Sequence, residues 1–199
     1  MRIPERLVIA TRNPGKVREI IRICYGWPTA WLTFETVSWP EIEEAGASYL
    51  ENAVLKAQGV AAAVGEAALA DDSGIEVDAL GGGPGPRSAR FAGEGAGDWD
   101  NLRLLIERLK ELPPAARGAR YRCVAALALP DGAEVWSEAT CEGRLILEPR
   151  GAGGFGYDPI FVPEGFDRTM AELSPQEKDA ISHRGKAFRA LRGVLETGG

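Results

Sequence analysis

Two adjacent carboxylates, Asp71 and Asp72, are the side chains of this sequence that most directly suggest chemistry. After a Ser-Gly turn, apolar residues alternate with acids over 75–79, which is the period of a half-buried strand. Adjacent acids at a strand end repel each other, so chains keep them mostly where a cation or a reacting proton lies between them. A solvated turn is the alternative, and this stretch alone leaves the two interpretations even. The alternation also predicts that the two side chains point to opposite sides of the strand.

A second candidate segment, 11–16, follows a short apolar run. Asn13 is a good N-cap and Pro14 suits a first helical position, so a helix is predicted to begin there. A helix N-terminus carries partial positive charge, and Arg12 and Lys16 add full charges that together would suit a phosphate. The spacing is not that of a Walker P-loop, and a segment of this kind alone is more often structural.

Other candidate side chains lie between these two segments. Glu43 and Glu44 belong to an acidic loop, which is usually solvated. Lys56 lies near the edge of the apolar stripe of a helix predicted over 48–64, where it could turn inward although a solvent-facing lysine is the default.

Two further segments suit the base of a nucleotide. Glycines in the loop 151–159 would let a ligand approach closely, and Phe155 offers a ring on which a base could stack, unless it lies in the core. His183 is the single histidine; the charge of its neighbour Arg184 disfavours the imidazolium, so we favour hydrogen bonding over proton transfer.

The elements that must position these residues alternate between strands and helices. Apolar runs and turn signals predict strands at 7–10, 33–37, 75–79, 119–129, 133–141 and 145–147, and helices from 14, over 48–64, around 99–109 and after 174. Capping boxes begin the helices at Ser48 and Ser174, and an Asp-Gly turn joins the strands of a hairpin. This pattern predicts an α/β fold, in which strand ends and their following loops hold ligands.

Composition sets outer limits on function. The 199 residues fit one domain, 1–199, and the net charge of −6 argues against a nucleic acid or an anionic membrane as the main partner. Three cysteines without Cys-x-x-Cys spacing indicate reduced thiols in a cytoplasmic protein rather than a disulfide framework or a zinc site. No apolar run is long enough for a signal peptide or a membrane span.

Taken together, the candidate side chains suit a nucleotide bound with a divalent cation. Lysines 16, 56 and 178 would face phosphates, Asp72 and the acidic loop would bind Mg²⁺, and Phe155 would stack on the base. Five segments also resemble the inosine triphosphate pyrophosphatase family, which removes non-standard purine nucleoside triphosphates; they are 11–16, 51–57, 71–93, 154–159 and 181–184.

The resemblance implies Mg²⁺-dependent hydrolysis of ITP, dITP or XTP to the monophosphate and pyrophosphate. It also implies an elongated mixed sheet with flanking helices, two lobes around a central cleft, and a homodimer. It assigns triphosphate binding to Thr11, Arg12, Asn13, Pro14, Gly15, Lys16 and Lys56. It assigns metal binding or water activation to Asp72 and contact with substrate to Ser73, and it places Phe155, Gly156, Tyr157, Asp158, Lys178, His183 and Arg184 around the base and sugar. Glu44 is the first choice for a further metal ligand and Glu43 the second.

Two alternatives remain open at this level. One is a related pyrophosphatase for modified pyrimidine triphosphates, and the other is a module that binds nucleotides without hydrolysing them. The acidic pair argues against the second, because a pure binder gains nothing from two adjacent carboxylates. For purines, a 6-oxo acceptor would suit donors from His183 and Arg184, whereas adenine presents a 6-amino donor.

Overall fold

The computed structural model describes residues 1–43 and 46–197. Within them the strands form one mixed sheet in the order β2-β1-β3-β4-β5-β6. The strands are β1 (Arg6–Ile9), β2 (Ala30–Leu32), β3 (Ala67–Val77), β4 (Gly118–Ala128), β5 (Glu134–Leu145) and β6 (Phe161–Pro163). The α-helices are α1 (Pro14–Ile23), α2 (Tyr49–Val64), α3 (Asp98–Lys110), α4 (Pro175–Ile181) and α5 (His183–Thr197). A mixed α/β fold with flanking helices is thereby confirmed.

The chain divides into two compact units, each built from separate stretches. Unit 1 comprises Met1–Asp72, Cys123–Ala139 and the chain from Arg184 onward, and unit 2 comprises Ser73–Arg122 and Thr140–His183. The organisation of 1–199 as one domain stays a prediction.

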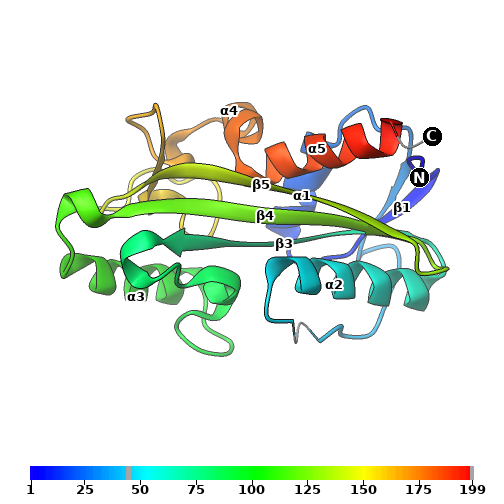
Figure 1. Ribbon diagram of the computed structural model, residues 1–199, viewed down its shortest axis with the longest axis horizontal. Coiled ribbons are helices and arrows are strands. Elements are labelled where there is room, and N and C mark those ends of the chain that lie inside the picture. The colour runs from blue at the N-terminus through cyan, green and yellow to red at the C-terminus, as the bar shows by residue number, and fades with distance from the viewer. Residues whose placement is uncertain (44–45, 198–199) are drawn as a thin grey trace. The chain divides into compact units, whose positions relative to one another are not determined.

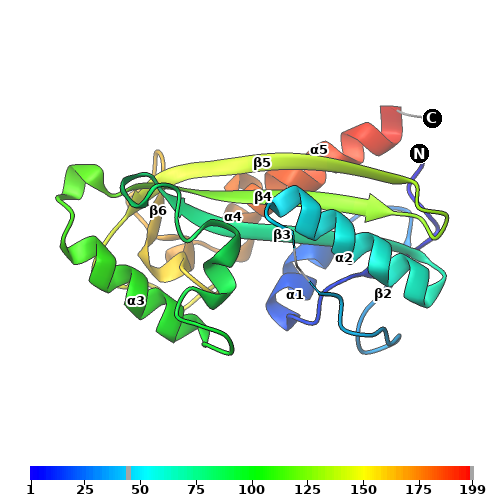
Figure 2. The same cartoon turned by 60° about the horizontal axis from the view of Figure 1, so that its bottom comes forward.

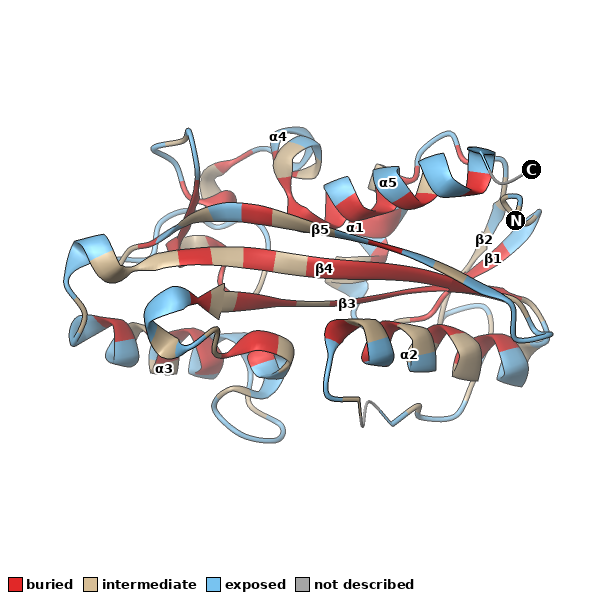
Figure 3. Cartoon of the chain, viewed as in Figure 1, coloured by how far each residue is buried: buried red, intermediate tan, exposed pale blue. Residues whose placement is uncertain are grey.

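In unit 1, helices cover both faces of the parallel strands (Figure 1). β1 pairs in parallel with β2 and β3, and Ile9 lies opposite Leu69. Because side chains alternate along a strand, Ile9 and Leu69 pack with α1 and α5, whereas Val8 and Ala68 pack with α2. Figure 2 shows α2 lying along this part of the sheet, and Figure 3 shows β3 and β4 as mostly buried here. Burial on both faces explains why these strands are apolar runs.

Unit 2 has its own apolar core. β6 runs antiparallel to β5, with Leu145 opposite Phe161. The apolar stripe of α3 packs with residues of β3, β4 and β6 in one cluster, which includes Ile75, Leu105, Tyr121, Ile160 and Phe161. None of the helices in the described ranges is long and apolar enough to cross a membrane.

Local signals in the sequence predicted several element boundaries correctly. Asn13 caps α1, the Ser48 capping box begins α2, and Gly65 ends α2 in the left-handed conformation with φ of 73°. The Ser174 capping box begins α4, and the hairpin of β4 and β5 turns at the predicted Asp-Gly.

Three strand predictions were wrong. β3 runs unbroken from Ala67 to Val77, so the acidic pair lies inside a strand and not at its end. The second strand is Ala30–Leu32 and not 33–37, because the backbone of Ala30–Leu32 pairs with Arg6–Val8. Thr33 begins a turn, in which the Thr33 carbonyl accepts from the Thr36 N–H. In place of a separate strand at 145–147, β5 continues to Leu145, because β6 pairs with Gly143–Leu145, and residues 146 and 147 lie beyond its end.

Candidate active site

The predicted phosphate segment follows β1, and the acidic pair lies in β3 just past the residues that pair with β1. β1 is paired with β3 only as far as Ile9 and Leu69. The loop after β1 and the Asp71-Asp72 pair therefore lie just beyond the carboxyl end of β1, which is where open α/β sheets hold ligands.

Side chains already occupy the amides at the start of α1. Asn13 Oδ1 accepts from the N–H groups of Gly15 (2.8 Å) and Lys16 (3.2 Å), and Thr11 Oγ1 accepts from the Asn13 N–H (3.2 Å). Pro14 has no N–H to offer. A phosphate at this helix would therefore meet the charge of Lys16 rather than open amides. Exposed Arg12 lies over the ring of Trp39, with 5.7 Å from its Cζ to the ring centroid.

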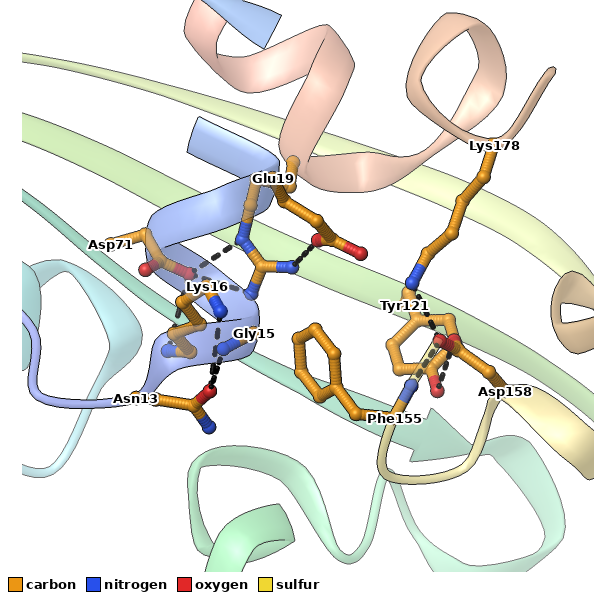
Figure 4. Close-up of polar contacts among 10 residues, drawn as sticks. Asn13, Gly15, Lys16, Glu19, Asp71, Tyr121, Phe155, Asp158 and Lys178 are labelled. Carbon is orange, nitrogen blue, oxygen red and sulfur yellow. Dashed lines mark hydrogen bonds and ion pairs between the residues drawn. The ribbon is translucent and has the colours of Figure 1, made fainter. Parts of the chain in front are cut away.

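Asp71 is the centre of a buried charge network (Figure 4). Its Oδ2 accepts from Arg184 Nε (3.1 Å) and Nη2 (2.9 Å), and it lies 3.2 Å from Lys16 Nζ. Arg184 Nη1 in turn donates to Glu19 Oε2 (2.6 Å). All four side chains belong to unit 1, and both Asp71 and Arg184 are about fully buried, with 0% and 2% of their side chains exposed.

The pKa values follow from these contacts. Burial alone would raise the pKa of Asp71, but the charges of Arg184, Lys16 and Lys56 outweigh it and hold that pKa well below its ordinary value. Burial alone would lower the pKa of Arg184, but Asp71 and Glu19 raise it above its ordinary value. Asp71 and Arg184 are therefore both charged at neutral pH.

Asp72 points to the other face of β3, as the alternation predicted. Its Oδ2 accepts from Asn52 Nδ2 of α2 at 3.2 Å, while Asp71 faces Arg184. The two carboxylates thus face different partners on opposite sides of β3. Lys56, also on α2, is half-buried and donates from Nζ to the Asp71 carbonyl at 3.0 Å, so it turns inward rather than to solvent. Ser73 follows half-buried in the same strand.

The predicted metal ligands can be assessed only in part. Glu44 lies outside the described residues, and Glu43 is exposed. In the described ranges no three histidine, cysteine or acidic side chains gather in a way that could hold a metal ion. Mg²⁺ is commonly held by one or two carboxylates, with waters and substrate phosphates completing its coordination. Buried Asp72, whose carboxylate accepts from Asn52, can supply one such carboxylate.

In unit 2, Asp158 organises the glycine-rich loop. Asp158 is buried, and its Oδ2 accepts from the Phe155 N–H (2.9 Å) and from Lys178 Nζ (2.5 Å). Its Oδ1 accepts from the Tyr121 hydroxyl at 3.2 Å. Gly154 has φ of 70°, and a Cβ there would lie 2.0 Å from Asp158 Oδ2, so this close approach requires glycine.

The ring of Phe155 is half-buried, with Lys178 Nζ 4.9 Å from its centroid (Figure 4). The ammonium of Lys178 therefore lies over the ring while it pairs with Asp158. Buried His183 is stacked on Tyr121, with centroids 4.5 Å apart and planes 7° apart.

The rest of the loop is held by Tyr157 and Gly156. The Tyr157 hydroxyl donates to the Ser88 carbonyl (2.8 Å), and burial together with the charge of Asp98 raises the pKa of that hydroxyl. The Gly156 N–H donates to Asp98 Oδ2 at 2.9 Å.

The predicted residues therefore gather within each unit as two groups. Unit 1 brings together Lys16, Lys56, Asp72 and Arg184, and unit 2 brings together Phe155, Asp158, Lys178 and His183. Whether each contacts a ligand stays a prediction.

Sequence reasoning missed Glu19, Tyr121 and Asp98. Glu19 lies between Val17 and Ile20 on the buried side of α1, and an acid in that stripe was a usable signal. Tyr121 and Asp98 had no such signal, because their partners Asp158 and Gly156 are 37 and 58 residues away.

Comparison with known proteins gives one consistent result. The model of the Ham1 family matches residues 7–194, a range that contains all five segments of the sequence resemblance. The chain is 50% identical over 196 residues to a dITP/XTP pyrophosphatase of Streptomyces avermitilis, with 96% of each chain covered. It is 45% identical over 196 residues to a dITP/XTP pyrophosphatase of Exiguobacterium sibiricum, with 96% of this chain and 98% of the relative covered. Among solved structures, a HAM1 protein from Coxiella burnetii matches with a TM-score of 0.86 and 40% identity, over 96% of this chain and 98% of that one.

Proposed function

We propose a function for this chain, which belongs to the Ham1 family. It hydrolyses non-standard purine nucleoside triphosphates (ITP, dITP and XTP) to the nucleoside monophosphate and pyrophosphate. One observation carries the proposal: about half of all residues are identical, over 96% of each chain, to a relative named dITP/XTP pyrophosphatase. The side-chain chemistry of the two units agrees with it.

The reaction needs a positioned water and neutralised phosphate charge, and little covalent chemistry from the protein. Water attacks the α-phosphorus, and a new P–O bond forms while the bond from that phosphorus to the bridging oxygen breaks. The electron pair leaves with pyrophosphate, and the carboxylate of Asp72 accepts the water's proton. The ammonium groups of Lys16 and Lys56 stabilise the charge that develops on the phosphate oxygens.

Mg²⁺ is part of the proposal. Asp72 would hold it together with Glu44 or Glu43 of the acidic loop, and the bound ion would supply further charge neutralisation at the phosphates. The support is the oxygen chemistry of these side chains and the orientation of Asp72 by Asn52.

Base selection is assigned to the residues of unit 2. Phe155 stacks on the base, and His183 donates to the 6-oxo group that inosine and xanthine share. Arg184 was expected to donate there as well, but three of its five N–H donors are directed to Asp71 and Glu19, so we assign it to the charge network instead.

A homodimer and a cytoplasmic location complete the proposal. The buried, reduced thiols of Cys24, Cys123 and Cys141 agree with a reducing compartment. Sedimentation equilibrium of the purified protein tests the dimer directly, because a mass of one chain at micromolar concentration would contradict it.

The decisive experiment is a panel of ITP, dITP, XTP, ATP, GTP and modified pyrimidine triphosphates with Mg²⁺, followed by detection of pyrophosphate. We expect the purine 6-oxo substrates other than GTP to be cleaved fastest, and in ¹⁸O-water the label should appear in the monophosphate. Asp72→Asn should reduce kcat by roughly a hundredfold or more while the fold survives, because the shape is kept and the charge is lost. Label in pyrophosphate, or fastest cleavage of a pyrimidine, would contradict the proposal, and binding without cleavage would favour a nucleotide sensor.

A further inference from the structure

We propose that Asp71 is a positioning residue that fixes the lysines of the polyphosphate site before any ligand binds. The inference rests on the proposed function in one respect, namely that Lys16 and Lys56 face phosphates. It concerns a carboxylate to which the sequence resemblance gives no role of its own.

The ammonium groups of both lysines contact this one residue. Lys16 Nζ lies 3.2 Å from the Asp71 carboxylate, and Lys56 Nζ donates to the Asp71 carbonyl at 3.0 Å. Asp71 itself lies inside β3, and its side chain is fully buried. The lysines extend from α1 and α2, so one rigid strand residue holds the ends of two flexible side chains from different helices.

An acid beside a phosphate-binding lysine would ordinarily weaken the site by repelling the phosphate. Here the same oxygen of Asp71 also accepts two N–H groups of Arg184, whose charge offsets it. The charged groups that act on Asp71 are Arg184, Lys16 and Lys56; Glu19 is bound to Arg184, and Asp72 is the next residue of the strand. Asp72 faces α2, the helix that also carries Lys56, so three cations balance three carboxylates, and Asp71 does not leave the lysines in excess negative charge.

The gain from this arrangement is entropic. A lysine side chain has four rotatable bonds, and ordering it when a ligand binds reduces the affinity. The Lys16 ammonium contacts Asp71 at 3.2 Å, and 17% of the Lys16 side chain stays exposed. Preorganisation of this kind increases affinity without adding a contact to the ligand.

The test is a double-mutant cycle on Asp71→Asn and Lys16→Met, with inorganic tripolyphosphate as the ligand and calorimetry as the readout. Asparagine keeps an oxygen for Arg184 but loses the charge that holds Lys16. We expect Asp71→Asn alone to weaken binding about three- to tenfold, and to have no further effect once Lys16 is methionine. Because the ligand carries no base and only its binding is measured, the result stands apart from whether the protein hydrolyses nucleotides.

Three results would overturn the inference. Tighter binding by Asp71→Asn would show that the carboxylate only repels the ligand. The same loss in the presence and absence of Lys16 would show a general structural effect. An equal loss in the matched control Glu19→Gln, which removes a second carboxylate from the same network, would assign the effect to the charge of the network as a whole.

A measurement on the unaltered protein keeps the inference testable if Asp71→Asn does not fold. The ammonium signal of Lys16 in ligand-free protein should be observable by ¹⁵N NMR. Its order parameter should be well above that of the ammonium of exposed Lys110. An order parameter of Lys16 as low as that of Lys110 would show that the Lys16 ammonium is not fixed, and the inference would fail.

Discussion

Replacing Arg184 by methionine tests whether this residue serves the fold or the base. Methionine has a similar length but neither charge nor donors, so three N–H contacts are lost, two to Asp71 and one to Glu19. The carboxylates of Asp71 and Glu19, whose side chains are 0% and 8% exposed, would then lose the guanidinium that lies between them.

Removing one partner from a buried charge pair typically destabilises a protein by about 3–5 kcal/mol. For a chain of this size each kcal/mol lowers Tm by about 2–4 °C, so we expect Tm to fall by about 6–20 °C. Thermal unfolding at pH 7 measures this. Arg192→Met is the matched control on the same helix, because Arg192 makes an exposed pair with Glu196, and such pairs contribute about 0–1 kcal/mol.

The pH dependence gives a sharper test. In the unaltered protein the pKa of Asp71 is depressed, so its ionised form stabilises the fold at any pH above the unfolded value of about 3.9. In Arg184→Met burial is offset less, and the folded-state pKa of Asp71 rises. Protonation then relieves the buried charge once pH falls to that raised pKa, so the Tm difference between the two proteins should narrow in acid. A difference that widens in acid would contradict this reasoning.

One result would refute the structural assignment of Arg184 altogether. If Arg184→Met unfolds within 1 °C of the unaltered protein, yet its kcat/KM falls for ITP and not for ATP, then the guanidinium serves the base. A matching fall for both substrates, together with the lower Tm, is what a role in the charge network predicts.

Three further perturbations address the loop and the caps. Gly154→Ala would force a Cβ against Asp158, so kcat/KM for ITP should fall by as much as roughly a hundredfold, and normal kinetics would show that the loop relaxes freely. Asp98→Ala removes the acceptor of the Gly156 N–H; KM for ITP should rise about two- to tenfold with kcat nearly unchanged, whereas a change in kcat alone would exclude a loop anchor. Ser48→Ala removes the cap of α2 and should cost about 0.5–2 kcal/mol in urea unfolding, and no measurable cost would mean that packing alone defines this helix start.

Much of the local structure followed from the sequence because its signals act over a few residues. An N-cap needs only a side-chain oxygen two or three residues before an amide, and the signals at Asn13, Ser48 and Ser174 were therefore sufficient. The five motifs likewise indicated the family without any structure, since their order and spacing are properties of the chain alone. Alternation along a strand also predicted that Asp71 and Asp72 face opposite sides.

Only the tertiary structure decided which charges meet. Arg184 and Asp71 are 113 residues apart, and nothing local to either predicts that α5 and β3 bring them together. The unbroken course of β3 past the acidic pair likewise depends on its neighbours, because β1 stops pairing at Leu69 while the sheet continues on the side of β4. A buried ion chooses its partner by which elements pack against it, and packing is a property of the whole chain. For that reason the sequence indicated Lys16 as a cation for phosphate and Arg184 as a donor to the base, whereas the fold determined that Asp71 holds them both.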